Sequence, residues 1–414
     1  MSAGRSRAAP TAARPRARRL LALLPALAAA APAAAQAPAW QFGAVLDVAH
    51  TTRALALGGR DQGLQLGHGD LTAAGPLGPW LRAQLGATVA THDGRLEHGI
   101  EEAFVETTAL PGGLQLRGGR FASQVGYLNE QHPHADDFSE RPLLYRAFLG
   151  GHWNDDGLRL NWTAPTPFFL MFGVEAMRGR RLVEEVAAPA GRVGVTTFVF
   201  KTGADIGREH AWQLGLSHIR NRREAAVDAH HDDHDDDDHD DDHDHDHGHD
   251  HGHDHGHDHG HDGHEHHHHH GAEFSGRRTW MVDLTWKWAP GGNPRSQQLR
   301  VGVEAARITG LNRYAGSRDR HEARAASIVW RWAPQWEVGA RADWLRVRMP
   351  HGDHFHGARL REHSLMLAFK PSHLQAVRLQ WTGQRDAVGF DDAARRSVQL
   401  QFVLGFGAHP AHAF

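Results

Sequence analysis

The sequence predicts an all-β protein: a transmembrane, antiparallel, up-and-down β-barrel of about 16 strands with long extracellular loops. Three observations predict this fold. Apolar and polar residues alternate along many segments, short and long connections alternate between those segments, and no long apolar run follows the N-terminal leader. A membrane helix needs roughly 20 consecutive apolar residues, so helices that span a membrane are excluded. The 414 residues include no cysteine, which excludes disulfides and thiolate metal sites.

The N-terminal residues have the parts of a secretory signal peptide. Residues 5–19 are rich in arginine, residues 20–30 are apolar, and residues 33–37 offer small side chains for cleavage. We therefore expect residues 1–37 to be removed during export. Residues 38–414 are expected to form a barrel in the bacterial outer membrane.

The alternation is clearest around residues 280–288. Trp280, Val282 and Leu284 lie on one face of an extended chain, and Met281 and Asp283 lie on the other. Period-two alternation of this length predicts strands with one apolar and one polar face. A soluble sandwich would have shorter strands and a second sheet over its apolar face.

The same pattern predicts sixteen strands along the chain. An even number places both termini on one side of the barrel, as bacterial barrels require. The predicted strands are 40–50, 62–74, 79–91, 99–109, 114–123, 157–164, 167–180, 194–203, 210–220, 277–288, 297–309, 322–332, 335–348, 359–370, 374–385 and 396–406.

The connections between these strands fall into two classes. Short connections rich in Gly and Pro are assigned to the periplasmic side, and longer polar connections to the outside of the cell. Trp162, Trp288 and Trp332 each end a strand just before a short turn. An indole is favoured where a membrane meets water, so these residues predict an aromatic girdle at that level.

The fifth outer connection contains a tract of extreme composition, residues 228–270, here called the His/Asp tract. It holds 20 His and 17 acidic residues, with no Lys or Arg. Such a segment cannot bury a core, so we expect residues 221–276 to form a disordered extracellular loop. Neutral imidazole is a good ligand for zinc, copper and nickel, and carboxylates add charge. The tract thus predicts many weak metal sites, although it could also be a solvated acidic loop that binds metal only in vitro.

Zinc is the expected ion, with nickel, copper and cobalt as alternatives. Candidate ligands in the tract are His230, His231, His234, His239, His243, His245, His247, His249, His251, His253, His255, His257, His259, His261, His264, His266, His267, His268, His269 and His270. Two other outer loops add compact sets of ligands: His132, His134 and Asp136 in the third, and His351, His354 and His356 in the seventh. Loops that meet at the barrel mouth would raise the local metal concentration there.

The long third outer loop also suggests a pore constriction. Its acids are Glu130, Asp137 and Glu140, and arginines on the predicted strand faces could lie opposite them. Opposed charges across a pore filter polar solutes. The alternative is that these acids only anchor the loop to the wall by ion pairs. The candidate arginines are Arg82, Arg117, Arg300, Arg331, Arg341 and Arg378, together with Arg120, which has the opposite parity from Arg117.

Three features carry a resemblance to a known family: the strand around residues 118–121 (GGRF), the long loop after it and the terminal Phe414. With these, the chain resembles bacterial outer-membrane porins of sixteen strands. It also resembles His-rich proteobacterial outer-membrane proteins linked to zinc supply. The resemblance implies that the third loop folds into the channel and that barrel-insertion machinery recognises the last strand and Phe414. Outer-membrane lipid is an expected partner of the barrel; the sequence leaves the oligomeric state open, with a homotrimer as one candidate.

We therefore expect a porin-like channel that captures zinc at the His/Asp tract and passes it to the periplasm. The main alternative is a general diffusion porin whose tract only buffers metal. A TonB-dependent receptor is less well supported, because it needs about 22 strands and a plug domain; a surface adhesin is a further alternative. No nucleophile elbow occurs, and the match to the zinc-protease pattern H-E-x-x-H at residues 264–268 falls inside the terminal His run of the tract, so we expect no enzyme. Export argues against a nucleic-acid partner.

Overall fold

The structure is a computed structural model of the full chain. It describes residues 40–407 apart from 93, 109, 181, 183–192, 224–271 and 391–392. The expected signal peptide, Phe414 and the whole His/Asp tract lie outside the described residues.

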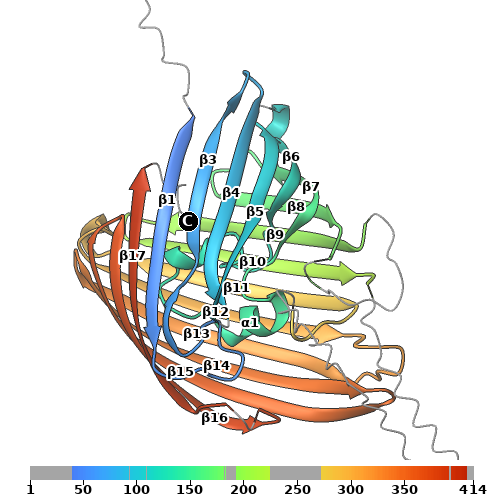
Figure 1. The fold of residues 1–414 in the computed structure, drawn as a ribbon. Coiled ribbons are helices and arrows are strands. Elements are labelled where there is room, and N and C mark those ends of the chain that lie inside the picture. The colour runs from blue at the N-terminus through green and yellow to red at the C-terminus, as the bar shows by residue number, and fades with distance from the viewer. Residues whose placement is uncertain are drawn as a thin grey trace, which may run out of the picture. The chain divides into compact units, whose positions relative to one another are not determined.

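The described residues form one closed antiparallel sheet of seventeen strand segments (Figure 1). The segments are β1 (Gln41–Thr51), β2 (Gly63–Leu66), β3 (Gly69–Leu77), β4 (Leu81–His92), β5 (Arg95–Thr107), β6 (Leu114–Ala122), β7 (Asn154–Thr163), β8 (Phe169–Met177), β9 (Val195–Ile206), β10 (His210–Asn221), β11 (Arg278–Trp288), β12 (Gln298–Thr309), β13 (Arg320–Ala333), β14 (Trp336–His351), β15 (His354–Ser372), β16 (Gln375–Val388) and β17 (Arg396–Gly407).

The sheet is a barrel of sixteen crossing strands. Segments β2 and β3 count as one crossing, because they follow each other and both pair with β1. Strand β17 pairs with β1 and closes the barrel. The predicted fold and strand number are confirmed, and each predicted strand overlaps an observed one. Strands β14 and β15 continue beyond the predicted limits at 348 and 359 to His351 and His354, and pair there as a hairpin.

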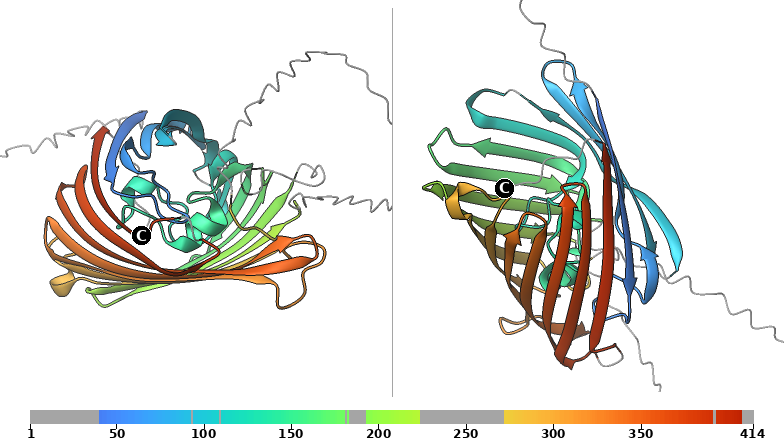
Figure 2. Two further views of the ribbon diagram at one scale, coloured as in Figure 1. Left: turned by 60° about the horizontal axis from the view of Figure 1, so that its bottom comes forward. Right: turned by 90° about the vertical axis from the view of Figure 1, so that its left-hand side faces the viewer.

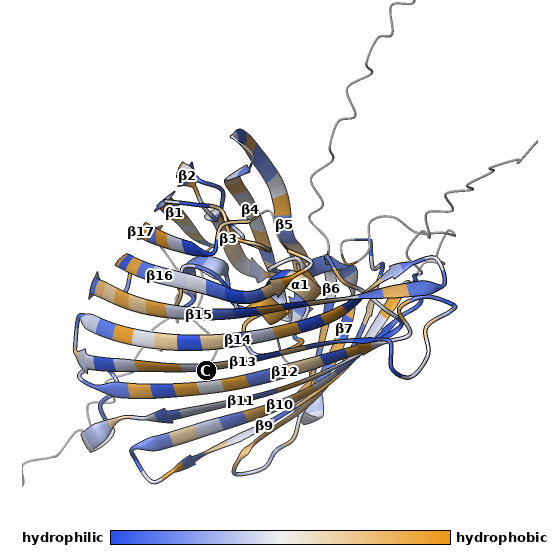
Figure 3. Ribbon diagram, turned by 90° about the horizontal axis from the view of Figure 1, so that it is seen from below, coloured by the Kyte–Doolittle hydropathy of each residue, from blue (hydrophilic) through white to orange (hydrophobic). Residues whose placement is uncertain are grey.

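Outward and inward faces differ as the alternation predicts. On β11, the side chain of Trp280 is 57% exposed whereas that of Asp283 is only 1% exposed. The outer surface is therefore apolar and the interior is polar, the reverse of a water-soluble protein. Figure 3 shows the resulting alternation of hydrophobic and hydrophilic bands along the strands. Such an exterior is suited to lipid, and closure pairs the backbone groups that lipid cannot satisfy. No helix among the described residues has the length and apolarity to cross a bilayer.

Aromatic residues gather at the ends of strands that lead into short turns. Trp332 and Trp336 stack across one such turn with ring centroids 6.1 Å apart, and Trp336 also contacts Phe369 at 4.8 Å. Trp162 donates a hydrogen bond from Nε1 to the carbonyl of Gly112 (3.0 Å), in the 3₁₀ turn η1 (Pro111–Gly113). These indoles lie at strand ends, as the predicted girdle requires.

The connection between β6 and β7, residues 123–153, folds into the barrel and is called loop 3 here (Figure 2). It contains the 3₁₀ turn η2 (Pro133–Ala135) and the helix α1 (Leu143–Leu149). All seven residues of α1 are buried. Gly150 ends the helix in the left-handed conformation (φ 60°), and its N–H bonds to the carbonyl of Tyr145.

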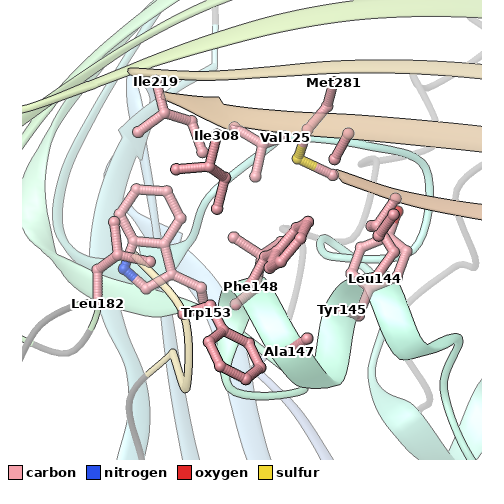
Figure 4. Packing of buried hydrophobic residues seen from close by; sticks show 14 of the residues in the cluster. Val125, Leu144, Tyr145, Ala147, Phe148, Trp153, Leu182, Ile219, Met281 and Ile308 are labelled. Atoms are coloured by element: carbon pink, nitrogen blue, oxygen red, sulfur yellow. The ribbon is translucent and has the colours of Figure 1, made fainter. Parts of the chain in front are cut away.

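An apolar core joins loop 3 to the barrel wall. Phe148 and Trp153 of loop 3 are buried with Ile219 and Ile308, which lie near the ends of β10 and β12 from which the long loops leave (Figure 4). Phe274, just before β11, belongs to the same core. Burial of each such side chain contributes roughly 1.5–3 kcal/mol, so loop 3 is held inside the barrel mainly by apolar contacts.

Candidate functional site

Loop 3 meets the polar part of the lumen through ion pairs. Glu130 lies 3.0 Å from Arg159 on β7 and 3.1 Å from Lys201 on β9. Burial alone would raise the pKa of the Glu130 carboxyl, but the charges of Lys201 and Arg159 outweigh burial and hold that pKa at about 2. Glu130 therefore stays ionised and fixes one end of the loop to the wall.

A second acid of loop 3 binds the opposite wall. Asp137 lies 2.5 Å from Arg300 on β12, and the same guanidinium lies 3.1 Å from Glu337 on β14. Glu337 also binds Lys370 at 2.7 Å. Lys370 is one of only three lysines in the chain, and the other two, Lys201 and Lys287, also sit on the inner face.

Glu140 and Arg341 hold the segment just before α1. Glu140 accepts hydrogen bonds from Gln399 (2.7 Å) and from the backbone N–H of Gly59 (2.9 Å). Arg341 donates to the backbone carbonyl of Glu140 (2.5 Å) while it binds Asp343 at 2.7 Å. Both predicted constriction residues thus contact the interface between loop 3 and the wall.

Three other predicted constriction residues pair within the wall rather than with loop 3. Arg117 binds Glu106 at 2.8 Å, and Arg82 lies 3.8 Å from the same carboxylate. Arg120 binds Asp156 at 2.9 Å. Its register partner on β5 is Ala103, one residue out of phase with the inward-facing Phe104.

A cavity of about 350 Å³ lies between loop 3 and the wall formed by β11 to β15. Its lining mixes acids with basic groups, and includes Tyr127, Asp137, Lys287, Arg300, Arg331 and Lys370. Such a lining suits small charged or polar solutes, because ligands of either sign find a counter-charge there.

On the other side of loop 3, four imidazoles and three carboxylates form a compact cluster, which we call the luminal His cluster. Its wall residues are His68, Asp70, Glu101 and Glu102, and its loop-3 residues are His132, His134 and His152. The ring centroids of His68 and His132 are 6.3 Å apart, and those of His132 and His134 are 5.6 Å apart. The cluster is largely buried.

Two β-bulges aim the wall carboxylates into the lumen. Val48 of β1 pairs with Leu66, and Val45 pairs with Asp70, so the second strand advances four residues (66 to 70) while β1 advances three (48 to 45). The extra residue lies at the break between β2 and β3 and reverses the phase of the alternation. Without this bulge Asp70 would face outward.

The neighbouring strand β5 has a similar irregularity. Gly86 of β4 pairs with Glu102, whereas Ala87 pairs with Ile100, so Glu101 is the extra residue. As a result, Glu101 and Glu102 are both buried although they are adjacent in sequence. Side chains that alternate regularly could not both face the lumen.

The loop-3 histidines differ in how readily they take a proton. Burial lowers the pKa of His132, but the carboxylates of Asp70 and Glu102 outweigh burial and hold it well above its usual value. Burial lowers the pKa of His152, and the nearby Glu101 only partly compensates. His132 therefore favours the imidazolium form and His152 the neutral form, so a metal ion that binds His132 must displace its proton.

The other predicted metal ligands among the described residues lie outside the luminal His cluster. Asp136 is held by Arg141 at 2.7 Å. On the β14–β15 hairpin, the rings of His351 and His356 are 6.4 Å apart, and His354 lies 3.5 Å from Asp353. The ligands of the His/Asp tract lie outside the described residues.

Sequence reasoning identified His132 and His134 but missed the wall residues. The available signals were weak: a Gly67-His68-Gly69 triplet and adjacent acids at 101 and 102, both inside predicted or observed strands. A glycine inside a strand suggests a bulge, and a pair of acids breaks the alternation.

Solved structures with this fold are outer-membrane porins and channels. The barrel superimposes on OprB of Pseudomonas putida with a TM-score of 0.55, at 11% identity over 89% of this chain and 94% of that one. The channel DcaP of Acinetobacter baumannii gives 0.52, at 10% identity over 89% and 97% of the two chains. An anion-selective porin from Comamonas acidovorans gives 0.50, at 11% identity over 89% and 100%. At these identities the likeness establishes a porin-like fold.

Sequence comparison adds little. No protein-family model matches the chain. It is 39% identical over 119 residues to an uncharacterized protein of Aquifex aeolicus (strain VF5), a match that spans 28% of this chain and 24% of that protein.

Proposed function

We propose that this protein is an outer-membrane channel that captures divalent transition-metal ions, zinc above all, at the His/Asp tract and admits them through the barrel to the periplasm. Export by a signal peptide, insertion by the barrel machinery and assembly as a homotrimer belong to the same proposal. The porin-like fold supports the channel, and the chemistry of the tract supports the metal.

One structural observation carries the metal part of this proposal: the described end of the tract connection is joined to loop 3 inside the barrel. The backbone N–H of Phe274 donates to the carbonyl of Ala147 in α1 (2.9 Å). The N–H of Ala272 donates to the carbonyl of Leu182 (3.2 Å), in the connection between β8 and β9. The residues that directly follow the tract are therefore attached to loop 3.

Attached in this way, the tract can hold metal ions at the mouth of the barrel and release them toward the lumen. Ligands tethered to the mouth hold metal at a high local concentration without a rigid site. Ions released from weak sites need only diffuse inward along the polar face of the barrel. Conduction requires binding that is weak enough to reverse, which suits many exposed imidazoles better than one tight site.

A second candidate is a general diffusion porin whose tract buffers metal outside the pore. The mixed charges of the 350 Å³ cavity favour it, because they suit small solutes of either sign. In that case removal of the tract would leave the passage of metal through the barrel unchanged.

Flux into proteoliposomes tests the proposal. Purified full-length protein and a variant without residues 228–270 are reconstituted around an entrapped fluorescent zinc indicator. At low micromolar external zinc, we expect the deletion to slow zinc entry severalfold, while entry of an uncharged sugar is equal for both proteins. Equal zinc entry would support the general porin. Absence of both fluxes in the full-length protein would contradict both candidates.

A further inference from the structure

The luminal His cluster contains a four-residue set with the arrangement of a metal site. We propose that His68, Asp70, Glu101 and His132 bind one resident divalent transition-metal ion, preferably zinc, and that this ion joins loop 3 to the barrel wall. The inference goes beyond the proposed transport function, because it concerns an ion that stays bound rather than the transported ions.

The distances fit a tetrahedral site. The four ligand atoms lie within 4.8 Å of one another. Nε2 of His68 is 3.1 Å from Asp70 and 3.0 Å from Glu101. Nδ1 of His132 is 3.4 Å from Asp70 and 3.7 Å from Glu101. Ligands on tetrahedral zinc at 2.0–2.1 Å from the ion are about 3.3 Å apart. Only small side-chain movements would therefore place all four around one ion.

Two members of the set, Asp70 and His132, have polar atoms that the protein satisfies poorly, whereas Glu101 forms hydrogen bonds with His68, His152 and Asn154. Among the described residues, both carboxylate oxygens of Asp70 and Nδ1 of His132 are buried without a well-formed hydrogen bond. A buried polar group without a hydrogen bond is costly, and an ion at that centre would satisfy these atoms together.

Two further histidines position the carboxylates. Nδ1 of His134 lies 2.7 Å from Oδ2 of Asp70, the oxygen that also lies 3.4 Å from His132, and Nδ1 of His152 lies 2.5 Å from Oε1 of Glu101, which leaves Oε2 for the ion. Groups that hold the second oxygen of a metal-binding carboxylate orient it and tune the affinity of the site.

Two β-bulges in the wall strands place the carboxylates of the proposed site. The bulges before Asp70 and at Glu101 interrupt two strands, and each brings a carboxylate to the inner face beside the luminal His cluster; the other register shifts, between β13 and β14 and between β15 and β16, involve none of its residues. Bulges are over-represented where a strand must redirect a side chain toward a functional site. Ion pairing between loop and wall needs no such irregularity, as Glu130 and its two cations show.

The bound ion would be structural: it would hold loop 3 to the barrel wall and would not itself be transported. Two ligands for it, His68 and His132, come from the wall and from loop 3, so a bound ion connects the two. A buried site with four protein ligands releases metal slowly, whereas a transit site must release it readily. Zinc with four protein ligands is typical of structural sites.

Retained metal in the intact protein tests this inference. Full-length protein in detergent is loaded with zinc, treated briefly with EDTA, passed through a desalting column and analysed for zinc per chain. The wild type should retain one equivalent more than His68→Gln on the wall and than His132→Gln on the loop. His50→Gln and His373→Gln, at exposed positions outside every candidate metal set, serve as matched controls and should retain as much as the wild type.

Two outcomes overturn the proposal: retention of no zinc by the wild type, and equal retention by the wild type, His68→Gln and His132→Gln. Heat-dependent migration on gels verifies that each variant forms the barrel. If a variant does not fold, the visible spectrum of Co²⁺ retained by the wild type decides, since intense bands of four-coordinate Co²⁺ are expected and a six-coordinate spectrum contradicts the site. Because zinc retention is independent of flux, this result is separable from failure of the transport proposal.

Discussion

At the scale of single residues, ion pairs between loop 3 and the barrel wall stabilise the position of the loop in the lumen. Glu130, with two cations on different strands, is the clearest case. Its folded-state pKa of about 2 lies below the ordinary value for glutamate. The stabilisation it contributes is therefore fully present above the unfolded pKa and is lost as pH falls from about 4.5 to about 2.

We predict that Glu130→Gln lowers the unfolding free energy by about 2 kcal/mol at pH 7 and that this difference from wild type shrinks as pH falls below 4.5. The free energies are to be measured by urea titration of refolded protein in lipid vesicles. A difference that is constant from pH 7 to pH 2.5 would show that the charge of Glu130 is not the cause.

A second residue-scale prediction compares two leucines. Leu144 in α1 is fully buried in the apolar core, whereas Leu284 on β11 is 44% exposed on the outer face. We expect Leu144→Ala to destabilise loop-3 docking by about 3 kcal/mol, because it leaves a cavity. Leu284→Ala should cost about 1 kcal/mol or less. Protease cleavage within loop 3 measures the docking, and similar cleavage of both variants would contradict the account.

At the scale of elements, period-two alternation was sufficient to predict the sixteen strands, because every strand has a lipid-facing side. The length of loop 3 and its acidic and histidine residues also indicated a role for this loop in the channel. Alternation could not predict the bulges, since one extra residue in a strand changes the facing of Asp70 without changing local composition.

The same limit explains why only part of the candidate site was predictable. His132 and His134 are close in sequence and stood out as a pair. Their partner Glu101 is 31 residues away from His132 (132 − 101), and His68 is 64 residues away (132 − 68). Only the path of the barrel brings them together, and no alternation pattern encodes which loop residue meets which wall strand.

The bulge between β2 and β3 gives an element-scale prediction. A Cβ on Gly67 would lie 2.4 Å from Arg60 and from Asp47, which themselves pair at 2.8 Å. Gly67→Ala should therefore open that ion pair, destabilise the protein by about 1–3 kcal/mol, and weaken zinc retention. Gly357→Ala on β15 is the control, because it lies away from both bulges and its nearest contact is an ordinary 3.5 Å. Unfolding midpoints that shift equally in both variants would refute the role of the bulge.

At the scale of the whole molecule, the barrel does not need the His/Asp tract for its integrity. The strands that flank the tract, β10 and β11, pair continuously from His210–Trp288 to Arg220–Arg278. Loop-closure entropy depends weakly on length, so removal of residues 228–270 should change stability by only about 1 kcal/mol.

We expect the deletion variant to retain the heat-dependent gel migration and the strand-rich circular dichroism of the wild type, and to lose most of its zinc capacity in an equilibrium dialysis experiment. A variant that fails to form the barrel would show that the tract has a structural role that its composition does not suggest.

The central claim is that an apolar exterior and a polar, loop-filled interior make this barrel a metal-responsive membrane channel. Single-channel recording in planar bilayers tests it most directly, with zinc added to one side at a time. We expect discrete conductance steps whose amplitude or gating changes with micromolar zinc on the side that carries the tract. The response to zinc should be weaker after deletion of residues 228–270. A bilayer in which the purified, folded protein produces no conductance steps would contradict it.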